Sequence, residues 1–195
     1  NRYTYAESSP VTNTFMNLKY LISRDGRYQN SYDLTNYYQQ GSIILLKNEH
    51  YIPMGFMVNS DLLKWQVNRN EDQFNPFDRQ NEFFKLATGV KDNVYTQLEV
   101  VSQGHTDYSQ FPVNKISYGN YSYNCTDTTT TPHLKWNYTA PYTGYVYVYA
   151  DIDGKDDVSL MINDESQNAK TLGMGRPYIA CGGYVNEGDK ISVYA

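Results

Sequence analysis

The sequence has few cysteines, no long apolar run and no excess of basic residues. Two cysteines are too few for a disulfide framework or a zinc site. The longest aliphatic run, Ile43 to Leu46, is far shorter than the ~20 residues that a membrane-spanning helix needs. The chain carries 16 lysines and arginines against 21 aspartates and glutamates, a net charge of −5. This balance argues against nucleic acid as a partner, because a phosphate backbone is bound through basic side chains.

Sequence signatures of common catalytic sites are also missing. The chain contains no G-x-S-x-G element, phosphate-binding loop or G-x-G-x-x-G element, and its three histidines share no metal-ligand spacing. No nucleophile, base and orienting group can be assembled from the remaining residues. We therefore expect no catalytic residue, no cofactor and no metal site, and a chain that is not a self-contained enzyme.

Aromatic residues are abundant instead. They make up 15% of the 195 residues, and 21 of them are tyrosines, which is enough to build a packed core. The first residue, Asn1, is not methionine, and no signal-peptide pattern follows it. The sequence thus reads as a processed product or a portion of a longer protein.

Capping signals predict two helices in the first half of the chain. Asn75 is a favoured N-cap, Pro76 suits the first helical position, and Gly89 is a typical residue just beyond a helix end. A helix is therefore expected between residues 75 and 89. Ser60 is the expected N-cap of a shorter helix that ends near Trp65.

Short segments with apolar residues at every second position predict strands and dominate the second half. We expect a hairpin from residues 43–46 and 54–58, and turns at Asp153–Gly154, Gly182–Gly183 and Glu187–Asp189. The pattern predicts a mainly β (α+β) fold with an antiparallel β-sandwich or jelly-roll-like part at 93–195 and a smaller helix-bearing part at 1–92. The further expected strands cover residues 15–23, 94–102, 134–138, 145–150, 158–162, 177–181 and 190–194.

The clearest alternating strand carries a row of tyrosines on one face, formed by Tyr145, Tyr147 and Tyr149. Its other face is apolar and is the better candidate for the core, which leaves the tyrosine face at least partly exposed. Aromatic rings with a polar hydroxyl suit contact with sugars, so these three residues are candidate glycan-binding residues. The alternative is a structural role in the second layer of the sandwich.

Two further groups of residues leave alternatives open. A carboxylate cluster around a glycine turn could hold Ca²⁺, or it could be a solvated turn that binds no metal; its members are Asp151, Asp153, Asp156 and Asp157. The two cysteines, Cys125 and Cys181, could form a disulfide in an oxidising compartment or remain as thiols.

Four groups of segments, in chain order, resemble elements of the YfhO family of bacterial membrane proteins. The first two are Ser9-Pro10-Val11 with residues 17–23, and residues 48–58. The others are Asn75-Pro76-Phe77 with Gln80-Asn81, Phe84 and Thr88-Gly89, and Gly182-Gly183-Tyr184 with residues 187–190. Cys181-Gly182 departs from the Leu-Gly of the family pattern.

The resemblance implies a setting and a function. Family members are polytopic membrane proteins of Gram-positive bacteria, similar to GT-C glycosyltransferases. These enzymes move a sugar from a polyprenyl-phosphate carrier to a cell-wall polymer such as lipoteichoic acid. The chain would then be a soluble extracytoplasmic portion that supports or positions the acceptor, with the parent transmembrane domain and a cell-wall glycan or teichoic acid as partners. The alternatives are a stand-alone carbohydrate-binding or adhesin module and a structural spacer.

Overall fold

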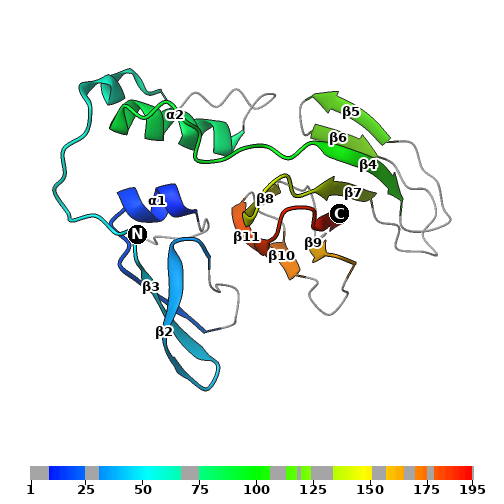
Figure 1. The fold of residues 1–195 in the computed structure, drawn as a ribbon, viewed down its shortest axis with the longest axis horizontal. Coiled ribbons are helices and arrows are strands. Elements are labelled where there is room, and N and C mark those ends of the chain that lie inside the picture. Colours follow the sequence, from blue (N-terminus) through cyan, green and yellow to red (C-terminus); the bar gives the residue numbers. More distant parts are fainter. Residues whose placement is uncertain are drawn as a thin grey trace.

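The computed structural model describes residues 9–24, 31–66, 75–105, 113–117, 120–123, 134–150, 157–164, 170–174 and 178–194. They form short helices and antiparallel strands (Figure 1). The elements are α1 (Pro10–Phe15), β1 (Tyr20–Ser23), β2 (Leu34–Gln40), β3 (Ile43–Asn48), the 3-10 helix η1 (Ser60–Lys64), α2 (Pro76–Thr88), β4 (Val100–His105), β5 (Val113–Ser117), β6 (Asn120–Tyr123), β7 (Leu134–Thr139), β8 (Gly144–Ala150), β9 (Asp157–Ile162), β10 (Lys170–Met174), β11 (Tyr178–Val185) and β12 (Lys190–Tyr194).

The first sheet has three strands in the order β1-β3-β2 and extends away from α1 (Figure 1). Leu34 and Leu46 are fully buried, whereas Ile43 at the start of β3 is exposed. The strand predicted at residues 43–46 is therefore present, but it is buried only toward its end.

The strand predicted over residues 15–23 is wrong in its first half. Ser9 caps a helix there, because its hydroxyl accepts a hydrogen bond from the backbone N–H of Thr12 at 3.3 Å. Pro10 occupies the first turn, where its missing N–H costs no hydrogen bond. The segment up to Phe15 is therefore helical, and the strand begins only at Tyr20.

The hairpin predicted from residues 43–46 and 54–58 is also wrong. β3 pairs with β1 on one side and with β2 on the other, so neither of its edges remains for a further partner. Pro53 and Gly55 also disfavour a regular strand. Met54 to Val58 instead belongs to an irregular loop between β3 and η1.

The helix predicted at residues 75–89 is confirmed as α2. The side-chain oxygen of Asn75 accepts hydrogen bonds from the backbone N–H groups of Phe77 and Asp78, at 2.9 and 3.4 Å. Gly89 ends the helix in the left-handed conformation with φ 77°. The short helix is present as η1, but its N-cap is Asn59 rather than Ser60.

The strand predicted at residues 94–102 begins only at Val100. At Tyr95, a side chain of α2 takes the place of a neighbouring strand. The Asn81 amide donates to the backbone carbonyl of Tyr95, and its oxygen accepts from the Tyr95 N–H, both at 2.9 Å. Because both backbone groups of Tyr95 bond to a side chain, they are not available to a neighbouring strand.

The second half is the predicted antiparallel sandwich. A five-stranded sheet has the order β10-β9-β12-β7-β4, and β8 pairs with β11. The buried core residues between them are Ala140, Val158, Leu160, Val185 and Ile191, against which Val146, Val148 and Ala180 pack. β5 and β6 form a further pair. The predicted turn at Gly182–Gly183 is wrong, because β11 continues through it with a register shift between Cys181 and Gly183, where Gly183 has φ 127°.

Candidate functional site

The tyrosine row on β8 faces the N-terminal part of the chain. Tyr145 pairs with Tyr184 of β11, and their rings lie 5.2 Å apart. Tyr147 pairs with Cys181, and its ring lies 5.7 Å from the ring of Tyr95. The alternation predicted from the sequence therefore holds, with the apolar residues of β8 packed against the core.

Tyr147 is held between the two halves of the molecule. Its hydroxyl oxygen accepts a hydrogen bond from the backbone N–H of Tyr32 at 3.3 Å, across 115 residues of chain. Burial raises the pKa of Tyr147 far above its usual range, and the nearby Cys181 and Asp33 raise it further. Burial likewise raises the pKa of Tyr95. Both phenols are therefore neutral donors and acceptors at any physiological pH.

A buried carboxylate lies close to these phenols. Asp33 is fully buried, and its two carboxylate oxygens accept hydrogen bonds from the Ser31 hydroxyl at 2.9 Å and from the Asn13 amide at 2.7 Å. A buried charge requires such partners, because its desolvation is costly without them. Asp33 thereby fixes the turn that carries Tyr32 at the surface.

Two of the segments that carry the family resemblance meet beside this carboxylate. The hydroxyl of Ser9, at the start of α1, donates to the side-chain oxygen of Gln80 on α2 at 2.7 Å. The hydroxyl of Tyr95 donates to the same oxygen at 3.4 Å. These contacts tie α1 to α2 and hold Tyr95 against Tyr147, so Ser9 and Gln80 position the site rather than form its exposed part.

The more accessible part consists of four rings, which we call the aromatic surface: Tyr32, His50 and Tyr184, which are exposed, and Tyr145, which is half-buried. The ring of Tyr32 stacks on that of His50 with centroids 5.1 Å apart and planes at 11°. It also meets Tyr145 edge-on at 6.4 Å. Tyr32 and Tyr184 remain 59% and 56% exposed, so ring faces are open to a ligand.

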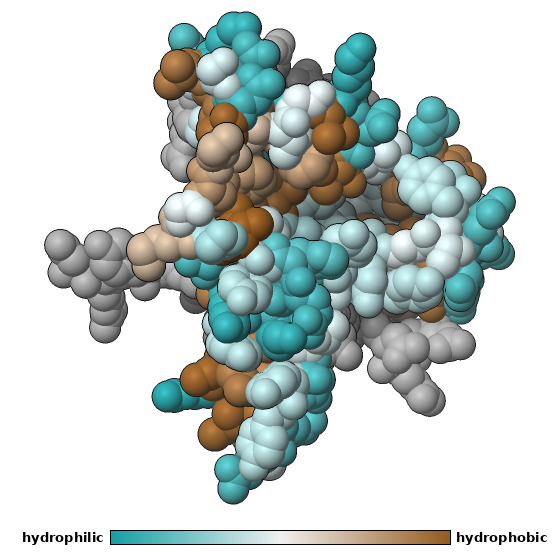
Figure 2. All heavy atoms as spheres, turned by 60° about the vertical axis from the view of Figure 1, so that its left-hand side comes forward, coloured by the Kyte–Doolittle hydropathy of each residue, from teal (hydrophilic) through white to brown (hydrophobic). Residues whose placement is uncertain are grey.

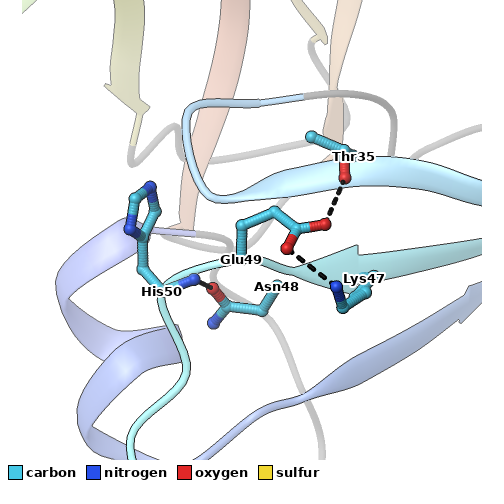
Figure 3. Close-up of polar contacts among 5 residues, drawn as sticks. All are labelled: Thr35, Lys47, Asn48, Glu49 and His50. Carbon is cyan, nitrogen blue, oxygen red and sulfur yellow. Dashed lines mark hydrogen bonds and ion pairs between the residues drawn. The ribbon is translucent and has the colours of Figure 1, made fainter.

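Polar side chains line the chain beside His50 (Figure 3). The backbone N–H of His50 donates to the side-chain oxygen of the buried Asn48 at 2.8 Å, which fixes the turn. The Glu49 carboxylate accepts from the Lys47 ammonium at 2.8 Å and from the Thr35 hydroxyl at 3.3 Å. The hydrogen bond to Lys47 lowers the pKa of Glu49.

This arrangement suits binding rather than proton transfer. In Figure 3 the His50 ring and the Glu49 carboxylate point to different sides, so the two do not form a carboxylate–histidine pair. The Glu49 charge is already matched by Lys47. What the surface offers a ligand is ring faces and hydroxyl groups.

The other candidate residues are only partly covered. Asp151, Asp153, Asp156, Cys125 and His133 lie outside the described residues, as does the predicted turn at 153–154. Within the described ranges, no group of His, Cys, Asp and Glu side chains could hold a metal ion. Both alternatives therefore stay open for the aspartate cluster (Ca²⁺ or a solvated turn) and for the two cysteines (a disulfide or thiols). Glycan contact by Tyr149, which is half-buried on β8, stays a prediction.

No sequence pattern indicated His50, Tyr32 or Tyr184 as site residues. They come from the turn after β3, the turn before β2 and the end of β11. The only local signal for these residues is the family resemblance, which includes His50 and Tyr184 but not Tyr32. Their proximity depends on how the three-stranded sheet lies against β8 and β11, which no local pattern encodes.

Comparison with known families places the chain among bacterial membrane proteins. Residues 1–193 match the YfhO family, which is described as bacterial membrane protein YfhO, and the chain therefore belongs to this family. Searches among curated proteins and among solved structures found no match. Within the described part of the chain, no helix is both long and apolar enough to cross a bilayer.

Proposed function

We propose that the chain is the extracytoplasmic portion of a YfhO-type glycosyltransferase and that it holds the polymer acceptor beside the membrane-embedded catalytic site. In this proposal the enzyme transfers a sugar from a polyprenyl-phosphate carrier to a cell-wall polymer such as lipoteichoic acid, and this portion supplies no catalytic group. Membership of a bacterial membrane protein family supports the setting. The resemblance to GT-C glycosyltransferases supports the reaction.

The observation that carries the acceptor role is the aromatic surface. Sugar rings present apolar C–H faces, which stack on aromatic rings, and hydroxyls, which bond to tyrosine oxygens. Tyr32 and His50 come from the N-terminal part, and Tyr145 and Tyr184 come from the sandwich. Four rings from two parts of the fold, fixed by the buried contacts beneath them, give a rigid platform that loses little entropy on binding.

The charges next to the aromatic surface indicate which kind of contact would hold the acceptor. A clamp on phosphate groups would use clustered arginines or lysines. Next to the aromatic surface, Lys47 already forms an ion pair with Glu49 at 2.8 Å. We therefore propose that ring stacking and hydroxyl groups provide the contact, with Tyr145 as a direct contact and Tyr147 as the support beneath it. Tyr149 remains a proposed contact from the same strand.

The test removes exposed rings without disturbing the buried ones. In Tyr32→Ala/Tyr184→Ala we expect affinity for purified lipoteichoic acid to fall at least tenfold in isothermal titration calorimetry, since two stacking surfaces are lost. The matched control is Tyr37→Ala/Tyr38→Ala on β2, whose rings are 61% and 59% exposed but lie outside the aromatic surface. It should bind like the wild type.

Two results would contradict the proposal. Equal loss in both double variants would mean that tyrosine content, and not this surface, determines binding. No binding by the wild-type chain to lipoteichoic acid or to its delipidated glycan would favour the structural spacer. Circular dichroism of each variant separates lost binding from lost folding.

A further inference from the structure

A second exposed surface lies in the loop between β3 and η1. The side chains of Met54, Met57 and Leu63 are 91%, 97% and 91% exposed, which is nearly complete. Phe56 and Val58 between them are also exposed, at 41% each. We call residues 51–60 together with Leu63 the apolar loop. Contiguous apolar side chains left in water mark an interaction surface more often than isolated ones do.

The apolar loop is anchored at its base. The Phe56 ring lies 5.5 Å from the Phe15 ring of α1, which in turn lies 4.8 Å from Phe83 of α2. At the end of the loop, the backbone N–H of Asn59 donates to the Ala87 carbonyl at 2.8 Å. The loop is therefore held on the helices while Met54 and Met57 point into solvent.

The apolar loop is also electrically neutral. Residues 51–60 contain no Asp, Glu, Lys or Arg. The nearest charges in η1, Asp61 and Lys64, form an ion pair with each other at 2.6 Å. Figure 2 turns the side of the molecule that bears this loop toward the reader and shows brown and tan surface among teal and white surface on that face. A charge that does lie against the loop is the Lys19 ammonium, 4.8 Å from the centre of the Tyr51 ring at its start. The occupant that fits the loop itself is apolar.

We propose that the apolar loop inserts into the hydrocarbon boundary of a lipid bilayer. The chain belongs to a family of membrane proteins, so a bilayer is the apolar phase nearest to it. Flexible methionine side chains enter a disordered acyl phase without needing a complementary shape. Insertion of this kind is driven by buried apolar area, and the aromatic Phe56 and Tyr51 suit the level of the headgroups. This inference is independent of sugar binding.

The first test measures partition of the chain into lipid vesicles. With phosphatidylcholine vesicles containing phosphatidylglycerol, we expect the chain to co-float, and Met54→Ser/Met57→Ser/Leu63→Ser to partition at least tenfold less. Val101→Ser/Tyr142→Ser is the matched control, because these side chains are 67% and 51% exposed on the other half of the molecule. Because the loop is neutral, binding should persist at 0.5 M salt, which screens charges beyond ~4–5 Å.

The second test measures how deeply the apolar loop inserts into the bilayer. Tryptophan fluorescence of Met57→Trp should be quenched by phosphatidylcholine brominated in the acyl chain, whereas Val101→Trp should be quenched no more than the wild-type tryptophans.

Failure of the wild-type chain to partition would overturn the proposal and leave a protein surface as the occupant. Equal partition of the triple variant would also overturn it. Since the loop lies outside the aromatic surface, its variants should retain wild-type affinity for the delipidated glycan of lipoteichoic acid, which has no acyl chains for the loop to bind. This keeps the present proposal and the acceptor proposal separately testable.

Discussion

Tyr145 and Tyr147 are two residues apart on the same face of β8, yet the structure gives them different roles. Tyr145 lies among exposed rings, whereas Tyr147 is covered by Tyr95 and bonded to the backbone of Tyr32. The difference comes from what lies above each residue and not from the strand. A phenol in the position of Tyr147 should therefore behave as a buried group when it titrates.

This burial predicts a loss of stability in alkali. Tyrosine in the unfolded chain ionises near pH 10, while folding holds Tyr95 and Tyr147 in the neutral form to higher pH. Above pH 10 the unfolded state has released protons that the folded state retains. The free energy of unfolding should thus fall by up to about 1.4 kcal/mol per pH unit for each of the two groups. Urea denaturation at pH 9, 10 and 11 measures this slope.

Tyr147→Phe isolates the contribution of one group, because it keeps the ring and removes the titrating hydroxyl. Above pH 10, the free energy of unfolding of this variant should fall less steeply with pH, by the contribution of about one proton, which is up to about 1.4 kcal/mol per pH unit. This holds whatever the change in absolute stability at pH 7. A wild-type slope in Tyr147→Phe would show that this hydroxyl is not protected by folding.

How far single residues could be predicted depends on whether their signal is local. The alternation along β8 placed three tyrosines on one face correctly, because strand geometry alone determines it. The stacking of Tyr32 on His50 joins segments with no shared pattern. The clamp of Asn81 on Tyr95 is similar, since an asparagine inside a helix gives no sign of which backbone it will bind.

At the scale of elements, prediction succeeded where the signal lies within the element. α2 is defined by its own caps, Asn75 and Gly89, and it forms where the sequence indicates. Met54 to Val58 has the composition of a strand but no partner, because both edges of β3 are occupied. β5 and β6 lie in a long polar stretch where no strand was expected. Strand pairing is a property of the whole sheet, and it determines the outcome both for Met54 to Val58 and for β5 and β6.

The glycine pair of β11 is a further case in which a local sequence signal was misleading. Instead of turning the chain, Gly182 brings β11 close to the opposite sheet. A Cβ atom on Gly182 would lie 2.9 Å from a methyl carbon of the fully buried Leu160 and 3.4 Å from the backbone oxygen of Val146. The close approach of the two sheets thus requires a residue without a side chain here.

Gly182→Ala is therefore expected to destabilise the protein by about 1–3 kcal/mol, the usual cost of overpacking a core. Gly144→Ala is the matched control, because Gly144 lies in the paired strand and nothing would come within 4 Å of its new methyl group. It should change stability by less than about 0.5 kcal/mol. Chemical denaturation of both variants measures the difference, and equal stabilities would contradict the packing described.

At the scale of the whole molecule, the division into parts at residues 1–92 and 93–195 remains a proposal. The contacts beneath the aromatic surface cross that boundary, through Asn81 to Tyr95 and through Tyr32 to Tyr147. We propose that the two parts act as one unit, because the aromatic surface takes rings from both. The apolar loop lies on the N-terminal part, so the proposed bilayer contact and the proposed acceptor contact would use different surfaces of the chain.

The most direct measurement of the central claim is a titration of lipoteichoic acid into the chain with isotopically labelled tyrosine and histidine rings, followed by nuclear magnetic resonance. We expect the ring signals of Tyr32, His50, Tyr145 and Tyr184 to shift together with one saturation curve, while those of Tyr37 and Tyr38 stay in place. Shifts at Tyr37 and Tyr38 alone, or no shift at the aromatic surface at saturating polymer, would contradict it.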